Sequence, residues 1–327
     1  MSRAAGASGD SEHRPDGAAG DPQHRAGAAG GDPQHRAGGA SGDPQHRAGG
    51  AGPRHEKVKL AVLGDPLRYT RSPDLHRAGC SALGLACESV ALRTPIAELP
   101  ATLDRLVREG YTGCNLTMPL KEPALALVAR ASDSAVRARS VNTIAFAPEG
   151  MTGETTDGAG FMDLLAGERR NAATCQITLL GAGGSARSLA RALDRAGGPP
   201  VRVVSRREPE PGEAWGGALG TRWAAWGSEA AERAIAATEV LVNCTPLGGD
   251  TFPVPVERIA RGTLVVDLTY GARVTPWVAA ARAAGLDAVD GLALLVHQAR
   301  HSLRRWFARE LADVPLEPLL AAVRRSP

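Results

Sequence analysis

The chain has 327 residues, a length that suits two domains of ordinary size. Hydrophobic residues make up 43% and charged residues 22%, which is typical of globular proteins, and the formal net charge of +3 is too small to indicate a nucleic-acid partner. The five scattered cysteines include no Cys-x-x-Cys pair, which argues against disulfides and a zinc site. Because no membrane span or signal sequence is evident, we expect a cytoplasmic protein.

Residues 1–56 contain an 11-residue repeat. The motif Gly-Asp-Pro-Gln-His-Arg-Ala-Gly starts at Gly20, Gly31 and Gly42. Its recurring histidine leaves a metal-binding tract open, whereas the glycine, proline and polar content favours a disordered tail. Large apolar side chains are almost absent, so burial cannot offset the entropy of ordering the chain. We expect this tail to lie outside the fold.

A first series of strands and helices is expected to begin at Val58. The apolar run 58–64 ends in glycine, which predicts a buried strand that leads into a turn. Two more strands and two helices alternate after it, at 87–92, 113–117, about 72–84 and about 96–109. Such alternation predicts an α/β domain with a parallel sheet.

A second series of apolar runs has the rhythm of a nucleotide-binding sheet. Its strands are expected at 175–180, 201–205, 240–243 and 264–268, with helices between them. The last segment, about 291–323, has a long helical pattern, with Leu303 and Trp306 on its apolar side.

A glycine-rich turn follows the first strand of this second series and opens a helix that runs to about Ala196. The residues of the turn are Gly181, Ala182, Gly183, Gly184 and Ser185. Glycines in this setting let the backbone approach a pyrophosphate at the positive end of the helix. A plain tight turn is the alternative, but the flanking strand and helix favour a dinucleotide site.

The residues that end the next strand bear on the choice of cofactor. Arg206 and Arg207 suit the 2′-phosphate of NADP, although surface arginines that serve solubility are an alternative. Glu208 would suit the free ribose hydroxyl of NAD. We therefore expect NADP and keep NAD open.

Lys121 is one of only three lysines among 38 basic residues, and the other two, Lys57 and Lys59, lie at the edge of the tail. In an arginine-rich chain this favours a position that needs an amine able to release a proton, with chance as the alternative. Lys121 follows the strand at 113–117, at the carboxyl edge where open α/β sheets bind ligands. Asp157 lies in a glycine-flanked segment, where a turn or helix N-cap is the alternative role.

Nine different short motifs follow one another along residues 58–320. They lie at 64–76, 115–121, 140–143, 156–158, 181–187, 243–248, 267–270, 275–277 and 291–298. Together they resemble the shikimate/quinate dehydrogenase family. The resemblance implies a mostly parallel α/β substrate domain, a Rossmann-type NADP-binding domain, and C-terminal helices that return to the first domain. The implied boundaries are 57–160, 161–290 and 291–327.

The resemblance also implies an NADP-dependent oxidoreductase acting on a CH–OH group, which reduces 3-dehydroshikimate to shikimate in chorismate and aromatic amino acid biosynthesis without a metal. Lys121 and Asp157 would form the catalytic pair. The residues implied for the substrate are Thr70, Ser72, Thr117, Asn142, Asp157, Tyr270 and Gln298. The residues implied for the cofactor are Gly181, Ala182, Gly183, Gly184, Ser185, Ser205, Arg206, Arg207, Leu268 and Gly291.

Four residues depart from the family pattern. Thr70 and Thr155 would affect the fit of the substrate, and Ser205 and Arg207 would affect the cofactor. A quinate or aminoshikimate dehydrogenase that uses NAD therefore stays open, as do a non-catalytic nucleotide sensor on the same fold and an interaction protein that acts through its tail. Neither a nucleic-acid nor a membrane partner is expected, and a homodimer is left open.

Overall fold

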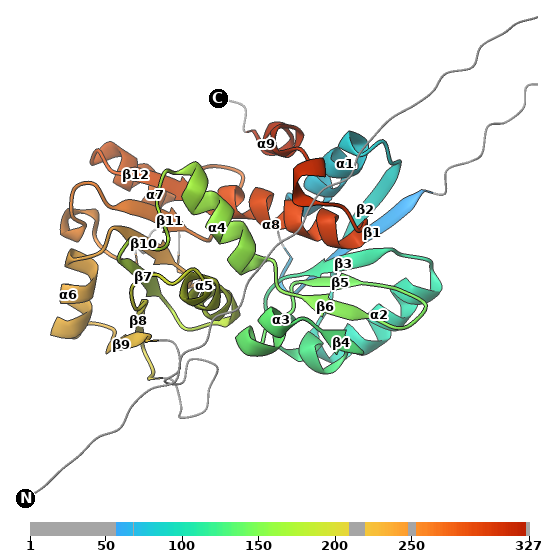
Figure 1. Cartoon of the computed structure of the whole chain (residues 1–327), viewed down its shortest axis with the longest axis horizontal. Helices are drawn as coiled ribbons and strands as arrows, with labels where there is room; N and C mark the ends of the chain where they lie inside the picture. The colour runs from blue at the N-terminus through green and yellow to red at the C-terminus, as the bar shows by residue number, and fades with distance from the viewer. Residues whose placement is uncertain (1–56, 68, 209–219, 248–252, 325–327) are drawn as a thin grey trace, which may run out of the picture. The chain divides into compact units, whose positions relative to one another are not determined.

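The computed structural model describes residues 57–67, 69–208, 220–247 and 253–324 (Figure 1). All of these belong to one compact unit, Pro53–Pro327. The repeats and their predicted disorder lie outside the described residues. The described secondary structure forms two six-stranded sheets with helices packed against them.

The first sheet has the strand order β2-β1-β3-β5-β6-β4. Its strands are β1 (Val58–Gly64), β2 (Cys87–Arg93), β3 (Gly113–Leu116), β4 (Arg130–Ala131), β5 (Thr143–Ala145) and β6 (Thr152–Glu154). The central strand β1 pairs in parallel with β2 and β3, as the alternating pattern predicts. β5, by contrast, runs antiparallel to β3, and it is also antiparallel to β6, to which a short hairpin joins it. β4 pairs in parallel with β6, so β5 alone runs against its neighbours among the described strands of this sheet.

Side chains of β1 alternate between two apolar clusters, one on each face of the first sheet. Leu60 packs with Leu75 of α1 (Ser72–Ala82), whereas Leu63 packs with Leu103 of α2 (Leu99–Arg108). Burial on both faces explains why β1 reads as a continuous apolar run. The helix expected from residue 96 starts with a 3₁₀ turn, Ile96–Glu98, before α2 begins. A short helix, α3 (Asp133–Ala138), follows β4.

The second sheet has the order β12-β11-β10-β7-β8-β9, and all of its neighbouring strands are parallel. Its strands are β7 (Ile177–Leu180), β8 (Arg202–Ser205), β9 (Arg222–Ala225), β10 (Val240–Asn243), β11 (Leu264–Asp267) and β12 (Asp287–Asp290). This is the order of a Rossmann sheet, in which the chain reverses its direction of progress between β7 and β10. Ligands of such sheets bind outside the carboxyl ends of the strands at this switch point.

The helices that accompany the second sheet are α4 (Asp157–Gly167), α5 (Gly184–Arg195), α6 (Glu229–Ala236) and α7 (Pro276–Ala283). α4 packs against both α5 and α8 (Gly291–Trp306). In Figure 1, α8 lies between the two sheets, and its side chains join both cores: Leu294 packs with the second sheet and Leu303 with the first. Residues on this part of α8 are therefore well placed to reach a site between the sheets.

The long helix expected at 291–323 is interrupted. α8 ends at Trp306, a 3₁₀ turn follows at Leu311–Asp313, and α9 (Leu316–Val323) completes the described chain. Pro315 lies immediately before α9, where its ring cannot continue a preceding helix. α9 packs on α1 and α8, so the C-terminal helices contact the first sheet's core.

None of the described helices has the length and apolar character needed to cross a membrane. Within the same described ranges, no cluster of histidine, cysteine, aspartate or glutamate side chains could hold a metal ion.

Candidate active site

A cavity of about 580 Å³ lies where residues from both sheets meet. Residues that follow β3, β7, β10 and β11 line it, so the cavity occupies the position expected for a ligand of an α/β sheet. The predicted site residues on its wall are Thr70, Ser72, Thr117, Lys121, Asn142, Asp157, Gly183, Gly184, Ser185, Leu268, Tyr270, Gly291 and Gln298.

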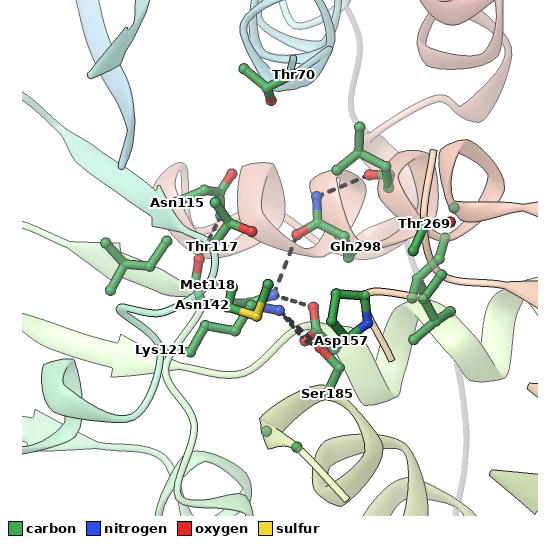
Figure 2. A pocket seen from close by; sticks show the side chains of 18 of the residues that line it. Thr70, Asn115, Thr117, Met118, Lys121, Asn142, Asp157, Ser185, Thr269 and Gln298 are labelled. Atoms are coloured by element: carbon green, nitrogen blue, oxygen red, sulfur yellow. Dashed lines mark hydrogen bonds and ion pairs between the residues drawn. The ribbon is translucent and has the colours of Figure 1, made fainter. Parts of the chain in front are cut away.

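Lys121 and Asp157 form an ion pair on this wall, although 36 positions separate them in the sequence. The Lys121 ammonium lies 2.6 Å from Oδ2 of Asp157 (Figure 2). Their side chains are 19% and 6% exposed, so both are largely shielded from water. Asp157 is the first residue of α4, where the helix dipole favours a negative charge.

Ser185 of α5 joins this pair through its hydroxyl. The ammonium of Lys121 donates to Oγ of Ser185 over 3.2 Å, and Oγ of Ser185 donates to Oδ2 of Asp157 over the same distance. Figure 2 shows the three side chains converging from different elements. A residue of the glycine turn, Ser185, therefore contacts both members of the Lys121–Asp157 pair.

Asn142 engages the other carboxylate oxygen. Its Nδ2 donates to Oδ1 of Asp157 over 2.6 Å, and its Oδ1 accepts from the backbone nitrogen of Thr156 over 2.8 Å. Because a backbone nitrogen can only donate, the Thr156 contact determines which end of the Asn142 amide faces the carboxylate. Both oxygens of Asp157 therefore have a fixed partner.

Gln298 of α8 continues the network across the cavity. Its Oε1 accepts from Oγ1 of Thr156 over 3.2 Å and lies 3.4 Å from Nδ2 of Asn142, while its Nε2 donates to the carbonyl of Leu295. Figure 2 shows Gln298 between Thr70 and the Lys121–Asp157 pair. α8 thereby contributes a polar group to the middle of the cavity.

Asn115, on the cavity wall, and His76, behind it, form a buried polar layer. Nδ2 of Asn115 donates to the carbonyl of Asn142 over 3.0 Å, and Oδ1 of Asn115 lies 2.8 Å from Nε2 of His76. The other ring nitrogen of His76 lies 2.8 Å from Oγ of Ser89. Burial lowers the pKa of His76 to about 4, so the ring is neutral at physiological pH. Sequence reasoning assigned no role to His76, although it lies in the first motif.

A second group of hydroxyls lies away from the ion pair. Oγ1 of Thr70 accepts from the backbone nitrogen of Ser72 over 3.2 Å and lies 3.3 Å from the Ser72 hydroxyl. Tyr270 completes this hydroxyl group, and burial raises the pKa of its phenol, which stays protonated and able to donate. In Figure 2, Thr70 lies near the top of the view, and Gln298 lies between it and Lys121. The cavity therefore offers hydroxyl donors at one end and a proton-carrying pair at the other.

The glycine turn faces the same cavity from the second sheet. Gly181 has φ +103°, a conformation that favours glycine, and no side chain caps the helix that starts at Gly184. The first amide groups of α5 are thus available to an anion such as a pyrophosphate. Within the turn, Gly181 and Ala182 do not line the cavity, whereas Gly183, Gly184 and Ser185 do.

The residues after β8 lie outside the cavity. Arg206, Arg207 and Glu208 are exposed on the surface. Ser205 is buried, and its hydroxyl donates to the carbonyl of Arg207 and accepts from Nε1 of Trp223. Ser205 therefore shapes the strand end, and the structure does not bring its hydroxyl to the cavity.

Several cavity residues had no role in the sequence prediction. They are Tyr69, Met118, Cys244, Thr245 and Leu295, among others. Most lie beside a predicted site residue, so the motifs marked the segments without indicating which side chains face inward. Thr155, expected to affect the substrate, does not line the cavity; its hydroxyl lies 3.0 Å from that of Ser188 on α5.

This combination defines a two-domain α/β protein whose Rossmann-type sheet presents a glycine turn to a largely shielded Lys–Asp pair. Residues 62–144 match the family described as shikimate dehydrogenase substrate binding domain. The chain is 38% identical to a shikimate dehydrogenase (NADP(+)) of Acidiphilium cryptum, over 75% of this chain and 89% of the relative. Identity to the protein of the same name from Gluconobacter oxydans is 37%, over 82% and 98%. The chain belongs to the shikimate dehydrogenase family, as its motifs predict.

Solved structures agree with this assignment. The shikimate dehydrogenase of Aquifex aeolicus has a TM-score of 0.72 and 26% identity, and the match covers 82% of this chain and 98% of that one. The enzyme of Thermus thermophilus in complex with NADP(H) and shikimate has a TM-score of 0.68 and 31% identity, covering 81% and 100%. The predicted two-domain α/β fold class is confirmed.

Proposed function

We propose that the chain is an NADP-dependent shikimate dehydrogenase, which catalyses the reversible conversion of 3-dehydroshikimate, NADPH and a proton into shikimate and NADP⁺. The observation that carries this proposal is the shielded Lys121–Asp157 pair on the wall of a cavity that faces a dinucleotide-type glycine turn. The relatives named above carry the same activity and cofactor in their names. The paired acid and base also argue against a non-catalytic nucleotide sensor.

The cofactor, when bound, supplies or accepts the hydride. The chain's own task is to position the ketone and to move the proton. In the direction of reduction, Lys121 donates a proton to the oxygen that becomes the alkoxide, and in the reverse direction it removes that proton. Asp157 orients the ammonium and the substrate hydroxyl, because its carboxylate is held by Lys121 and Asn142 at once. Proton-transfer groups of this kind contribute about 10²–10⁴-fold to the rate.

The two ends of the cavity suit the two ends of the substrate. Thr70, Ser72 and Tyr270 would hold the carboxylate through their hydroxyls. The ring hydroxyls would be bound by Thr117, Asn142, Asp157 and Gln298. With the substrate carboxylate held at one end of the cavity, the ketone would lie at the other end. The reacting carbon would then lie between Lys121 and the glycine turn.

The residues around the second sheet fit a dinucleotide. The turn Gly181–Ala182–Gly183–Gly184–Ser185 would hold the pyrophosphate through its backbone amides, and nothing lies within 4 Å of the space that a side chain at Gly183 would occupy. Leu268 and Gly291 would line the nicotinamide side, and Arg206 and Arg207, after Ser205, would hold the 2′-phosphate. The names of the relatives favour NADP over NAD.

A spectrophotometric assay at 340 nm tests the proposal. The chain would be given shikimate or quinate, each with NADP⁺ or NAD⁺. We expect the highest kcat/KM with shikimate and NADP⁺. A preference for quinate with NAD⁺ would favour the alternative that Thr70 and Glu208 leave open. The homodimer and the cytoplasmic location stay predictions.

A further inference from the structure

Two serine hydroxyls of α5 point at the start of α4. Ser185 and Ser188 are three residues apart, so they lie on the same side of the helix. One contacts the Asp157 side chain, and the other contacts the backbone directly after it. The helix that opens with the glycine turn therefore touches the carboxylate and its supporting helix at two points.

The Ser185 hydroxyl has a defined direction. An ammonium can only donate hydrogen bonds, so Oγ of Ser185 accepts from Lys121. Its own hydrogen is then available to Oδ2 of Asp157. Ser185 was expected only to line the cofactor, yet its hydroxyl completes a triangle with the ion pair, whose third side is the 2.6 Å contact. Hydrogen bonds to charged groups are stronger than those between neutral groups.

Ser188 supplies a cap that α4 lacks. The residue before the helix, Thr156, makes no side-chain cap, and its hydroxyl donates to Asn142 and Gln298 instead. Oγ of Ser188 instead accepts from the backbone nitrogen of Gly158 over 3.1 Å. Ser188 is 2% exposed, so water cannot substitute for it readily.

Thr155, just before α4, and Gly158, within it, both lie against Ser188. The hydroxyl of Thr155 lies 3.0 Å from that of Ser188 and gives it a second partner. A Cβ on Gly158 would lie 2.6 Å from the carbonyl oxygen of Ser188, so the two helices approach too closely there for a side chain. The start of α4 is thus fixed against α5 by backbone packing and by hydrogen bonds.

We propose that Ser185 and Ser188 are positioning residues, which hold the Lys121–Asp157 pair in its reactive geometry from the helix that carries the cofactor turn. This inference rests on the proposed function. It means that one rigid element, α5, sets both the place of the dinucleotide and the orientation of the carboxylate. Displacements of such groups by a fraction of an ångström lower the rate of reaction without removing any reacting group.

The test measures catalysis and cofactor binding separately. For Ser185→Ala we expect kcat with shikimate and NADP⁺ to fall about 10-fold, because a hydrogen bond to each charged partner is lost. The KM for shikimate and the Kd for NADP⁺, the latter measured by calorimetry, should change less than about 2-fold. Ser185→Thr keeps a hydroxyl and should restore most of kcat.

Ser188→Ala tests the capping contact, with Ser228→Ala as its matched control. Ser228 caps α6 by accepting from Ala231, away from the cavity. Both substitutions remove one capping hydroxyl and should lower the melting temperature. Only Ser188→Ala is expected to lower kcat, by about 5-fold, since only its cap lies beside Asp157.

Three results would overturn the inference. In the first, Ser185→Ala weakens NADP⁺ binding but keeps kcat at saturating cofactor, which makes Ser185 a cofactor ligand alone. In the second, Ser185→Ala changes neither quantity. In the third, Ser188→Ala has no more effect on kcat than Ser228→Ala. Ser185→Ala decides the matter even if Ser188→Ala does not fold. An unsubstituted chain inactive with shikimate and NADP⁺ would instead contradict the proposed function.

Discussion

Asn142 donates a 2.6 Å hydrogen bond to Oδ1 of Asp157, the carboxylate oxygen that Lys121 does not contact. The Asn142 amide cannot turn over, because its oxygen accepts from the backbone nitrogen of Thr156. The carboxylate is thus oriented before any substrate arrives. Polar groups held in place in this way need no reorganisation during the reaction, which is a large part of how active sites lower barriers.

The first prediction concerns Lys121 as the proton donor. Lys121→Ala should lower kcat by about 10²–10⁴-fold with only a modest change in the KM for shikimate, because proton transfer matters only as the alkoxide forms. Steady-state rates at 340 nm measure both parameters.

Lys121→Arg is the matched control for this prediction. It keeps a positive charge beside Asp157 but replaces an amine that can release its proton by a guanidinium that cannot. Its kcat should be as low as that of Lys121→Ala. Near-normal turnover would show that Lys121 only binds, and would move the acid–base role to Asp157 or to water.

The second prediction separates binding from chemistry at the other end of the cavity. Ser72→Ala should raise the KM for shikimate about 10-fold and leave kcat within about 3-fold, because a hydroxyl that grips a remote carboxylate contributes equally before and during hydride transfer. The same assay measures this effect. A loss in kcat without a change in KM would mean that Ser72 acts on the reacting centre instead.

Much of the fold could be predicted from the sequence because its central strands are buried on both faces. β1, β7, β10 and β11 read as apolar runs for this reason, and each lies within two residues of its predicted bounds. β5 could not be predicted in the same way. It has three residues, too few to show a periodicity, and it runs antiparallel to β3.

The site was predicted in part. Lys121 stood out by composition, and the glycine turn by its flanking elements, but no pattern along the chain could show that Ser185 faces the ion pair and not only the cofactor. The contact between Ser188 and Gly158 could not be predicted from the sequence either, because it depends on how closely α4 and α5 pack. Contacts between helices distant in sequence are set by tertiary packing, which local periodicity does not encode.

The third prediction concerns the cofactor. Arg206→Ala should raise the KM for NADP⁺ at least about 10-fold and leave that for NAD⁺ nearly unchanged, because only the former carries the 2′-phosphate that a guanidinium binds. Arg207→Ala should have a smaller effect of the same kind. Equal effects on the two cofactors, or a preference of the unsubstituted chain for NAD⁺, would mean that Glu208 dominates the site.

The last prediction follows from the hydrogen bonds of His76. Because the Asn142 carbonyl can only accept, it fixes Nδ2 of Asn115 as the donor, and Oδ1 of Asn115 must then accept from Nε2 of His76. Nδ1 of His76 therefore accepts from the Ser89 hydroxyl. A protonated ring would lose that acceptor while fully buried, which agrees with the lowering of the His76 pKa to about 4.

This buried neutral histidine makes the folded state sensitive to acid. An unfolded chain binds a proton at His76 below about pH 6.5, whereas the folded chain does so only near pH 4. Stability from this group is therefore complete above pH 6.5 and is lost as the pH falls toward 4. The expected loss between pH 7.5 and pH 5 is about 2 kcal/mol in the free energy of unfolding.

Urea unfolding of the unsubstituted chain and of His76→Gln, each at pH 7.5 and pH 5, measures this contribution. The variant has no proton to take up at this position, so its free energy of unfolding should fall by about 2 kcal/mol less over the same interval, although it starts from a lower value. The difference between the two chains removes the contribution of carboxylates that titrate in both. Parallel losses in the two chains would show that the pKa of His76 is the same in the folded and unfolded chains, and the buried neutral ring would then be wrong.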